Sequence, residues 1–274
     1  MTEEFDDFDR RLEMFEERVG FARLRSVTGA DGVCAHWEDL RTRLSSHLPL
    51  NVRPYHFDVS PLESGLVEAD WTWQRGEDSV SVEIVVSGAG PARVHERLFA
   101  IATETTMVRI PFGPGPQDLG DLAVRHRVPG ADAILWAYRN VCVSVDGQGP
   151  DVDVEPVART IQRFMVAHHV PRVAQCLPRV ERVDRSAGQI NVGDEWRLSL
   201  ALAKITPAES VMIDLAEIHE RDAGCRLETI RVGSLAATYR AIAPGTARVD
   251  VRVVDRKTLL SPPLSASVQI LPAR

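Results

Sequence analysis

His56 and Asp58 are the best pair for general acid–base chemistry that the sequence offers. They alternate with Tyr55 and Phe57 in a stretch that has the two-residue period of a β-strand, so both project from one face of that strand. An imidazole beside a carboxylate can exchange a proton with a substrate, although a solvated surface pair has the same spacing. The thiol of Cys142 lies between two valines, where burial as a small apolar side chain is the ordinary outcome. We therefore name no catalytic residue and keep His56 and Asp58 as a candidate polar site.

Three stretches contain residue types that could bind a metal or a nucleotide. The run from Asp146 to Glu155 holds four acids and two glycines, which suits calcium, but it lacks the glycine and glutamate positions of an EF-hand. His168, His169 and Cys176 do not have the spacing of zinc ligands. The glycines of residues 88–93 lack the third glycine of a dinucleotide loop and the lysine of a P-loop. The sequence therefore predicts neither a metal nor a cofactor.

Charge and hydropathy exclude some classes of partner. The formal net charge is −7, and residues 1–20 contain eight acids against three arginines. An acidic chain repels phosphate backbones, so we expect no nucleic-acid partner. The longest apolar run has six residues, far from the ~18 that cross a bilayer, and no basic, apolar leader opens the sequence. We therefore predict no membrane span and a cytoplasmic location.

The first fifty residues predict a pair of helices. Apolar residues recur at spacings of three and four and form one stripe, and a second helix is expected at about 33–48. Packing of this stripe on the protein's own core is the plain interpretation. The alternative is that it docks in the groove of a protein partner or of a second copy. The candidate interaction surface consists of Phe5, Phe8, Leu12 and Phe15, and the stripe continues to Val19.

Residues 51–170 predict a two-layer α/β domain, in which one mostly antiparallel sheet carries helices on one face. Alternation of apolar and polar residues indicates strands, and a period near 3.6 indicates helices. The expected order is three strands, a helix, three strands and a helix. The expected strands are residues 55–59, 71–74, 80–86, 119–126, 133–138 and 141–145, and the expected helices are residues 93–103 and 154–167.

Three stretches of this domain carry a resemblance to a known family. They are Leu119-Gly-Asp-Leu-Ala, Trp136-Ala-Tyr-Arg-Asn-Val-Cys-Val-Ser-Val and Asp153-Val-Glu-Pro-Val-Ala-Arg. With them, residues 67–168 resemble the compact α/β domain of actinobacterial cell-envelope lipoproteins. The resemblance implies a binding or scaffold role and no known reaction. The lipid-attachment cysteine and the signal peptide of that family do not precede the match.

Residues 171–187 are expected to be a linker, because prolines interrupt a run of alternating charges. Residues 188–274 then predict short strands with frequent turns, which indicate a β-sandwich. On Val192-Gly-Asp-Glu-Trp, residues 239–251 and Ser267-Val-Gln-Ile, this part resembles a bacterial immunoglobulin-like domain. Chagasin-type protease inhibitors share that shape, but Lys204-Ile-Thr-Pro-Ala-Glu-Ser stands where their Asn-Pro-Thr-Thr-Gly loop would be.

The fold class predicted for the whole chain is therefore α+β followed by an all-β immunoglobulin-like sandwich, with an N-terminal helical pair. The function expected from this architecture is a non-enzymatic binding or assembly module with a protein partner or self-association. An enzyme or small-ligand binder is the alternative, with its pocket between sheet and helices or at the domain junction. Clustering of His56, Asp58, His126 and His168 would favour that alternative. An immunity or protease-inhibitor protein is the third hypothesis.

Overall fold

The computed structural model describes residues 2–48, 58–61, 66–103, 112–150, 152–203, 211–218, 226–233, 235–255, 257, 259, 261 and 264–273. The side chains of residues 2–9, 11, 47, 58–61, 75 and 211–218 are not among what it describes. The chain divides into two compact units, Met1–Cys176 and Leu177–Arg274. Within the described residues, no helix combines the length and apolarity that crossing a bilayer requires.

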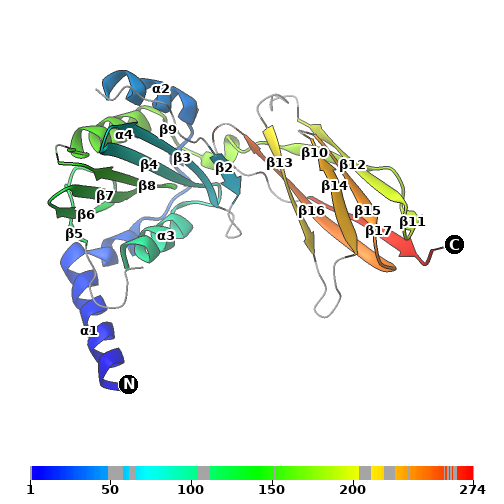
Figure 1. Cartoon of the computed structure of the whole chain (residues 1–274), viewed down its shortest axis with the longest axis horizontal. Helices are drawn as coiled ribbons and strands as arrows, with labels where there is room; N and C mark the ends of the chain where they lie inside the picture. Colours follow the sequence, from blue (N-terminus) through cyan, green and yellow to red (C-terminus); the bar gives the residue numbers. More distant parts are fainter. Residues whose placement is uncertain are drawn as a thin grey trace. The chain divides into compact units, whose positions relative to one another are not determined.

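The first unit is built on one seven-stranded sheet (Figure 1). Its strand order is β2-β3-β4-β8-β7-β6-β5, and every neighbouring pair is antiparallel. The three-strand, helix, three-strand, helix order predicted from the sequence is present, with one further two-residue strand. The strands are β2 (Asp58–Pro61), β3 (Leu66–Arg75), β4 (Asp78–Ser87), β5 (Gly113–Pro114), β6 (Leu122–Val128), β7 (Ala131–Tyr138) and β8 (Val141–Gln148).

Helices cover both faces of this sheet, so the prediction of helices on one face is wrong. On one face, Leu135 of β7 belongs to the core cluster that also contains Leu98 of α3 (Pro91–Thr103). On the other face, the neighbouring Trp136 donates a hydrogen bond from Nε1 to Gln162 Oε1 of α4 (Glu155–Ala167), 3.0 Å away. Six consecutive residues of β7 are buried, because the strand is covered on both sides.

The two N-terminal helices pack on different faces of the sheet and do not form the predicted pair. Phe15, near the end of α1 (Thr2–Val19), lies in the cluster with α3, together with residues of the short helix η1 (Phe21–Ser26). In contrast, α2 (Trp37–His47) accompanies α4, and its Ser45 accepts a hydrogen bond from Trp73 Nε1 at 3.1 Å. It starts at Trp37 because the residues before it form the strand β1 (Gly32–Val33), which pairs with β9 (His169–Val170).

The second unit is a β-sandwich of two four-stranded sheets. The sheet orders are β10-β12-β15-β14 and β11-β17-β16-β13. Trp196 and Tyr239 from the first sheet share one buried cluster with Val251 and Val268 from the second, so the two apolar faces form a common core. The strands are β10 (Val180–Arg185), β11 (Gln189–Asn191), β12 (Glu195–Leu202), β13 (Val211–Ile218), β14 (Leu227–Val232), β15 (Ala236–Ala241), β16 (Gly245–Asp255) and β17 (Leu264–Leu271).

The stretch expected to be a linker contains ordered elements of both units. It holds the single-turn helix η2 (Val173–Gln175) and the strand β10, which pairs with β12. Val180 and Val183 are half-buried against the sandwich core, whereas the charged residues between them stay exposed. Burial of these two valines and pairing of the backbone outweigh the polar composition that suggested a linker.

Candidate functional site

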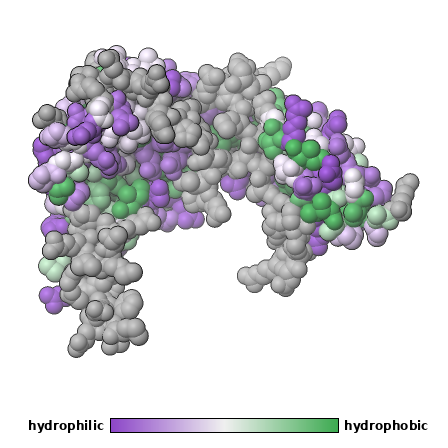
Figure 2. Space-filling view, viewed as in Figure 1, coloured by the Kyte–Doolittle hydropathy of each residue, from purple (hydrophilic) through white to green (hydrophobic). Residues whose placement is uncertain are grey.

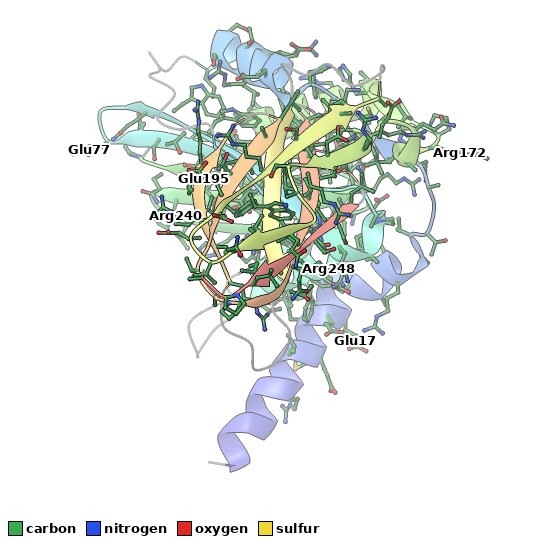
Figure 3. The ribbon with its side chains drawn as sticks, turned by 90° about the vertical axis from the view of Figure 1, so that its right-hand side faces the viewer. Glu17, Glu77, Arg172, Glu195, Arg240 and Arg248 are labelled. Atoms are coloured by element: carbon green, nitrogen blue, oxygen red, sulfur yellow. The ribbon has the colours of Figure 1, made fainter. Side chains whose placement is uncertain are left out.

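The predicted interaction stripe on α1 belongs in part to the protein's own core. Phe15 is buried, with its ring centroid 5.7 Å from that of Phe21, and Leu12 is half-buried. The side chains of Phe5 and Phe8 lie outside the described residues. The helix itself is continuous from Thr2, and Figures 1 and 3 show that its first turns extend beyond the sheet and the other helices of this unit. The stripe thus runs from the core of the unit into a projecting part of the helix.

The predicted polar site lies outside what the structure describes, which does not include His56 or the side chain of Asp58. Two other histidines of that hypothesis are on opposite faces of the sheet. The His126 ring lies 5.9 Å from the Phe112 ring on the α3 face. The His168 ring stacks on Phe164 of α4, with centroids 4.2 Å apart. The structure therefore does not bring these two histidines together around one cavity.

An open apolar groove lies between η1 and α3, beside the end of α1. It encloses about 370 Å³, and its apolar walls come from the buried Phe21 and Leu24 of η1 and from the half-buried Phe99 of α3. We call it the η1–α3 groove. Figure 2 shows hydrophobic surface on the first unit between α1 and the strongly polar surface above it. The groove is lined by Glu16, Phe21, Leu24, Arg25, Val27, Thr28, Ala92, His95, Glu96 and Phe99.

Aromatic packing forms the floor of the η1–α3 groove. Phe21 and Phe99 meet edge to face, with ring centroids 5.2 Å apart and an interplanar angle of 90°. This geometry is favoured for aromatic pairs because the positive ring edge meets the negative ring face. Phe21 is buried, whereas Phe99 is half-buried and contributes apolar surface to the groove.

His95 places a polar atom in this apolar lining. Its Nε2 is buried and has no hydrogen-bond partner among the described residues. Burial lowers the pKa of His95, and the Asp121 carboxylate opposes that shift. A buried ring nitrogen without a partner is unfavourable until a donor or acceptor reaches it. The groove therefore combines apolar walls with one unsatisfied polar group, as binding sites commonly do.

The rim of the groove carries charges that are largely paired within the chain. Arg25 is 81% exposed and lies 3.7 Å from Glu16. Glu96 accepts a hydrogen bond from Arg93 at 2.8 Å. Both carboxylates that line the groove thus have an arginine partner. Residues 18–30 contain three arginines and no acid, and of these three Arg25 lines the groove, whereas Arg18 and Arg23 line a different pocket.

A second polar cluster lies at the β7–β8 hairpin. The Tyr138 hydroxyl is 3.4 Å from His169 Nδ1, and His169 Nε2 is 3.4 Å from Asp31 Oδ2. Burial raises the pKa of Tyr138, and the charge of Arg139 opposes the shift. Arg139 has a φ of 54°, which is uncommon for a residue other than glycine. A tyrosine, a histidine and an aspartate in this order can exchange a proton, because the carboxylate stabilises the imidazolium.

Glu155, one of the acids considered as calcium ligands, is paired with arginines in the structure. Glu155 accepts hydrogen bonds from Arg125 and Arg159, each at 2.8 Å, and these arginines lower its pKa. Arg125 also binds Asp132 through two hydrogen bonds of 2.9 and 2.7 Å, and Asp132 is only 3% exposed. These contacts tie α4 to β6 and β7, which is a structural role.

A shallow depression of about 610 Å³ lies on the outer face of one sheet of the second unit. It is lined by residues of β12, β14 and β15. Ile230 is 41% exposed and Val232 is 49% exposed, and both lie on β14, an edge strand of the described sheet. Exposed apolar residues on an edge strand indicate a second surface where another chain can pair or pack.

Sequence patterns missed the η1–α3 groove but contained one signal for it. In the helix predicted at residues 93–103, Val94, Leu98 and Ile101 recur at helical spacing and form the face that packs on the core. His95 and Phe99 are also spaced by four residues and form an adjacent stripe, which lines the groove. For the hairpin cluster no comparable signal exists, because Asp31, Tyr138 and His169 come from three distant parts of the chain.

No protein-family model matches the sequence, and no curated protein matches it. Among solved structures, domains 4 and 5 of the S-layer protein SbsC are similar at 10% sequence identity and a TM-score of 0.23, over 58% of this chain and 65% of that one. The gamma-CGTase of alkalophilic Bacillus clarkii is similar at 8% identity and a TM-score of 0.19, over 78% of this chain and 25% of that one. This chain spans less than two thirds of either. Similarity this low carries no argument about fold or function.

Proposed function

We propose that the chain is a non-enzymatic binding or assembly module that acts through protein–protein contacts. The observation that carries this proposal is the η1–α3 groove. It is open and apolar, and it contains the unpartnered Nε2 of His95. A groove of this kind receives an amphipathic helix or an extended apolar segment in many complexes. The projecting part of α1 next to it adds a second surface that a partner can contact.

The placement of the titratable residues supports a module over an enzyme. His126 and His168 lie on opposite faces of the sheet, and the carboxylates of Asp132 and Glu155 are paired with arginines. Nucleophilic catalysis needs a nucleophile and a base within hydrogen-bond reach of each other, with a third group that orients the base. The hairpin cluster of Tyr138, His169 and Asp31 is the feature that favours the alternative, a small-ligand or catalytic site.

For the second unit we propose an immunoglobulin-like sandwich. Its sheet orders match the A-B-E-D and G-F-C arrangement of that fold if β10, β12, β15 and β14 are strands A, B, E and D. β11 then corresponds to a continuation of strand A that crosses to the other sheet, where it pairs in parallel with β17. Such domains commonly serve as contact modules, and the exposed apolar residues of β14 suit that role. The immunity or inhibitor hypothesis is a special case of the same contact function.

Site-specific photocrosslinking in the cells that produce the protein tests this function. A benzophenone side chain is placed at Arg25 or at Glu96, on opposite sides of the groove, and in a third variant at Glu77. Glu77 is exposed in the β3–β4 turn and serves as the control (Figure 3). We expect covalent protein adducts from both groove positions and none from Glu77. Absence of adducts at the groove, with the variants folded and expressed, would overturn the proposal.

A further inference from the structure

We propose that the edge strand β14 pairs with β14 of a second copy of this chain. The two strands run antiparallel about a two-fold axis, in a register that places Leu227 opposite Val232 and Glu228 opposite Arg231 of the other copy. The sheet β10-β12-β15-β14 of one copy thereby continues into the same sheet of the other. This contact lies in the second unit and does not depend on what binds in the η1–α3 groove.

β14 has an edge on which another strand can pair. It is the last strand in the order of its described sheet, and its one neighbour there is β15. An edge strand presents a row of backbone N–H and C=O groups that can pair with another chain. Ile230 is 41% exposed and Val232 is 49% exposed, and both are of the β-branched type that favours strands. Pairing at this edge would therefore satisfy backbone groups and cover apolar surface.

A β-bulge in β14 determines which of its residues share a face. Ile230 is the extra residue, because Thr229 and Arg231 stand opposite consecutive residues of β15. Leu227 and Val232 stand opposite buried alanines of β15, so both are on the inner face of the sheet. In a regular strand this pair, which is separated by an odd number of residues, would lie on opposite faces. The bulge thus gives the two halves of β14 a matching inner face.

The backbone groups of Leu227 and Val232 point to the free edge. The carbonyl of Arg226 and the amide of Gly233, which flank β14, both form hydrogen bonds on the side of β15. Successive residues of a strand direct their backbone groups to alternate sides, so those of Leu227 and Val232 point away from β15. In the proposed register, Leu227 of each copy exchanges both backbone hydrogen bonds with Val232 of the other.

Opposite charges meet in the same register. Glu228 stands opposite the exposed Arg240, and Arg231 lines the depression on the outer face, so both charges are on that face. Glu228 of each copy then lies opposite Arg231 of the other, and the symmetry forms this contact twice. Glu228 is 3.7 Å from Arg240, but both side chains are more than half exposed, so this pair is weak and leaves the carboxylate accessible. Arg231 has no acidic partner among the residues that the structure describes.

The bulge favours a second copy over an unrelated extended segment. A bulge on an edge strand hinders pairing with a regular strand, which has no matching extra residue. A second copy carries the same bulge, and the two bulges face each other across the axis. A shift of one residue would place Leu227 opposite Arg231, an inner-face residue against an outer-face residue. The register that matches both faces is therefore also the one that joins Glu228 to Arg231.

Sedimentation equilibrium of the full chain tests this arrangement. β14 has six residues, so the contact is small, and we expect a reversible dimer with a dissociation constant in the micromolar to millimolar range. Val232→Pro removes an N–H group that points to the free edge, where proline is tolerated because the pairing with β15 does not use that group. This variant should dimerise at least about tenfold more weakly. Circular dichroism verifies that it keeps its fold.

A charge exchange within one chain tests the register, and a folding defect cannot imitate its result. Glu228→Arg alone and Arg231→Glu alone each place like charges opposite each other twice, so each should weaken the dimer about tenfold or more at low salt. The double variant Glu228→Arg/Arg231→Glu again joins opposite charges and should recover an affinity close to that of wild type. Arg197→Glu is the matched control, because Arg197 is 70% exposed on the interior strand β12. It should leave the dimer unchanged.

Each outcome decides for or against the β14 contact. A wild-type protein that stays monomeric up to about 1 mM overturns it. So does a dimer that Val232→Pro and the single charge reversals leave intact, and so does a double variant that stays as weak as the single ones. Recovery in the double variant supports both the second copy and the register. Crosslinks from the η1–α3 groove decide the proposed function separately, because that groove is in the first unit.

Discussion

Asn140 shows how one polar residue in the core can hold several elements. It is fully buried, and its Oδ1 accepts a hydrogen bond from the Val33 amide at 2.7 Å. Its Nδ2 donates to the carbonyl oxygens of Val33 and Ser87, at 3.3 and 3.1 Å. The sequence predicts only a turn at this position. The side chain actually joins β1 and the end of β4 to the β7–β8 hairpin.

Replacing Asn140 by alanine tests this role. Asn140→Ala removes three hydrogen bonds to buried backbone groups, each worth about 1–3 kcal/mol, so we expect the free energy of unfolding to fall by about 3 kcal/mol or more. Urea denaturation measures the change. Gln74→Ala, which removes an exposed amide in the same unit, should change stability by less than about 0.5 kcal/mol. Equal effects of the two substitutions would contradict the role assigned to Asn140.

The buried thiol of Cys142 should make the stability of the folded protein depend on pH. Burial raises its pKa to about 12, from 9.0 for a free thiol. Above pH 9 the unfolded chain loses this proton first, so stability falls as pH rises from about 9 to about 12. The native thiol should also resist iodoacetamide, which the half-buried Cys34 and Cys176 should not. Peptide mapping after a short labelling pulse measures this, and early labelling of Cys142 would show that the strand opens.

At the scale of elements, β6 starts later than predicted because the chain turns just before it. The sequence predicts an extended segment from Leu119, but β6 starts at Leu122. Gly120 has a φ of 61°, which turns the chain. The next amide, of Asp121, then donates to the Ala137 carbonyl at 2.7 Å, and the Asp121 carboxylate accepts from the Arg139 amide at 2.6 Å.

Two glycines of the same sheet provide a matched pair of substitutions. In Gly120→Ala the new methyl group would overlap the Ala137 carbonyl oxygen. We therefore expect the free energy of unfolding to fall by at least about 3 kcal/mol. Gly130 has a φ of 80° but an added methyl group meets nothing within 4 Å. Gly130→Ala should therefore lower the free energy of unfolding by only about 1–2 kcal/mol, which is the cost of the left-handed backbone for a residue with a Cβ atom. Thermal unfolding followed by circular dichroism distinguishes them, and similar losses would refute the steric argument.

Most of the strands and helices could be predicted from local sequence, because each is either periodic in its apolar residues or, like β7, apolar at nearly every position between turn residues. The helix predicted at 154–167 is α4 at Glu155–Ala167, and the strand predicted at 141–145 is the first part of β8. Short elements could not be predicted. β1 and β9 have two residues each, and they depend on pairing between distant segments, which leaves no local pattern.

At the scale of the whole molecule, the order of elements along the chain was predictable, but not the surface on which each helix packs. Both α1 and α2 carry one apolar stripe, and such stripes do not specify which face of a sheet they cover. The sequence of β7 indicates that both faces of the sheet are covered. Ala133–Tyr138 is apolar at nearly every position, which is typical of a strand buried on both faces. The η1–α3 groove follows from that packing and could not be predicted without it.

The parallel pairing of β11 with β17 also has a consequence for biosynthesis. Gln189 stands opposite Gln269, so the second strand of the second unit pairs with its last strand. A ribosome adds about 5–20 residues per second, and the eighty residues between these positions therefore take about 4–16 s to emerge. During that interval β11 has no partner strand, and once β16 has emerged, the edge of β16 also stays uncovered until β17 follows. A nascent chain that stalls before β17 exposes this edge to other nascent chains, and those on the same messenger RNA are the nearest.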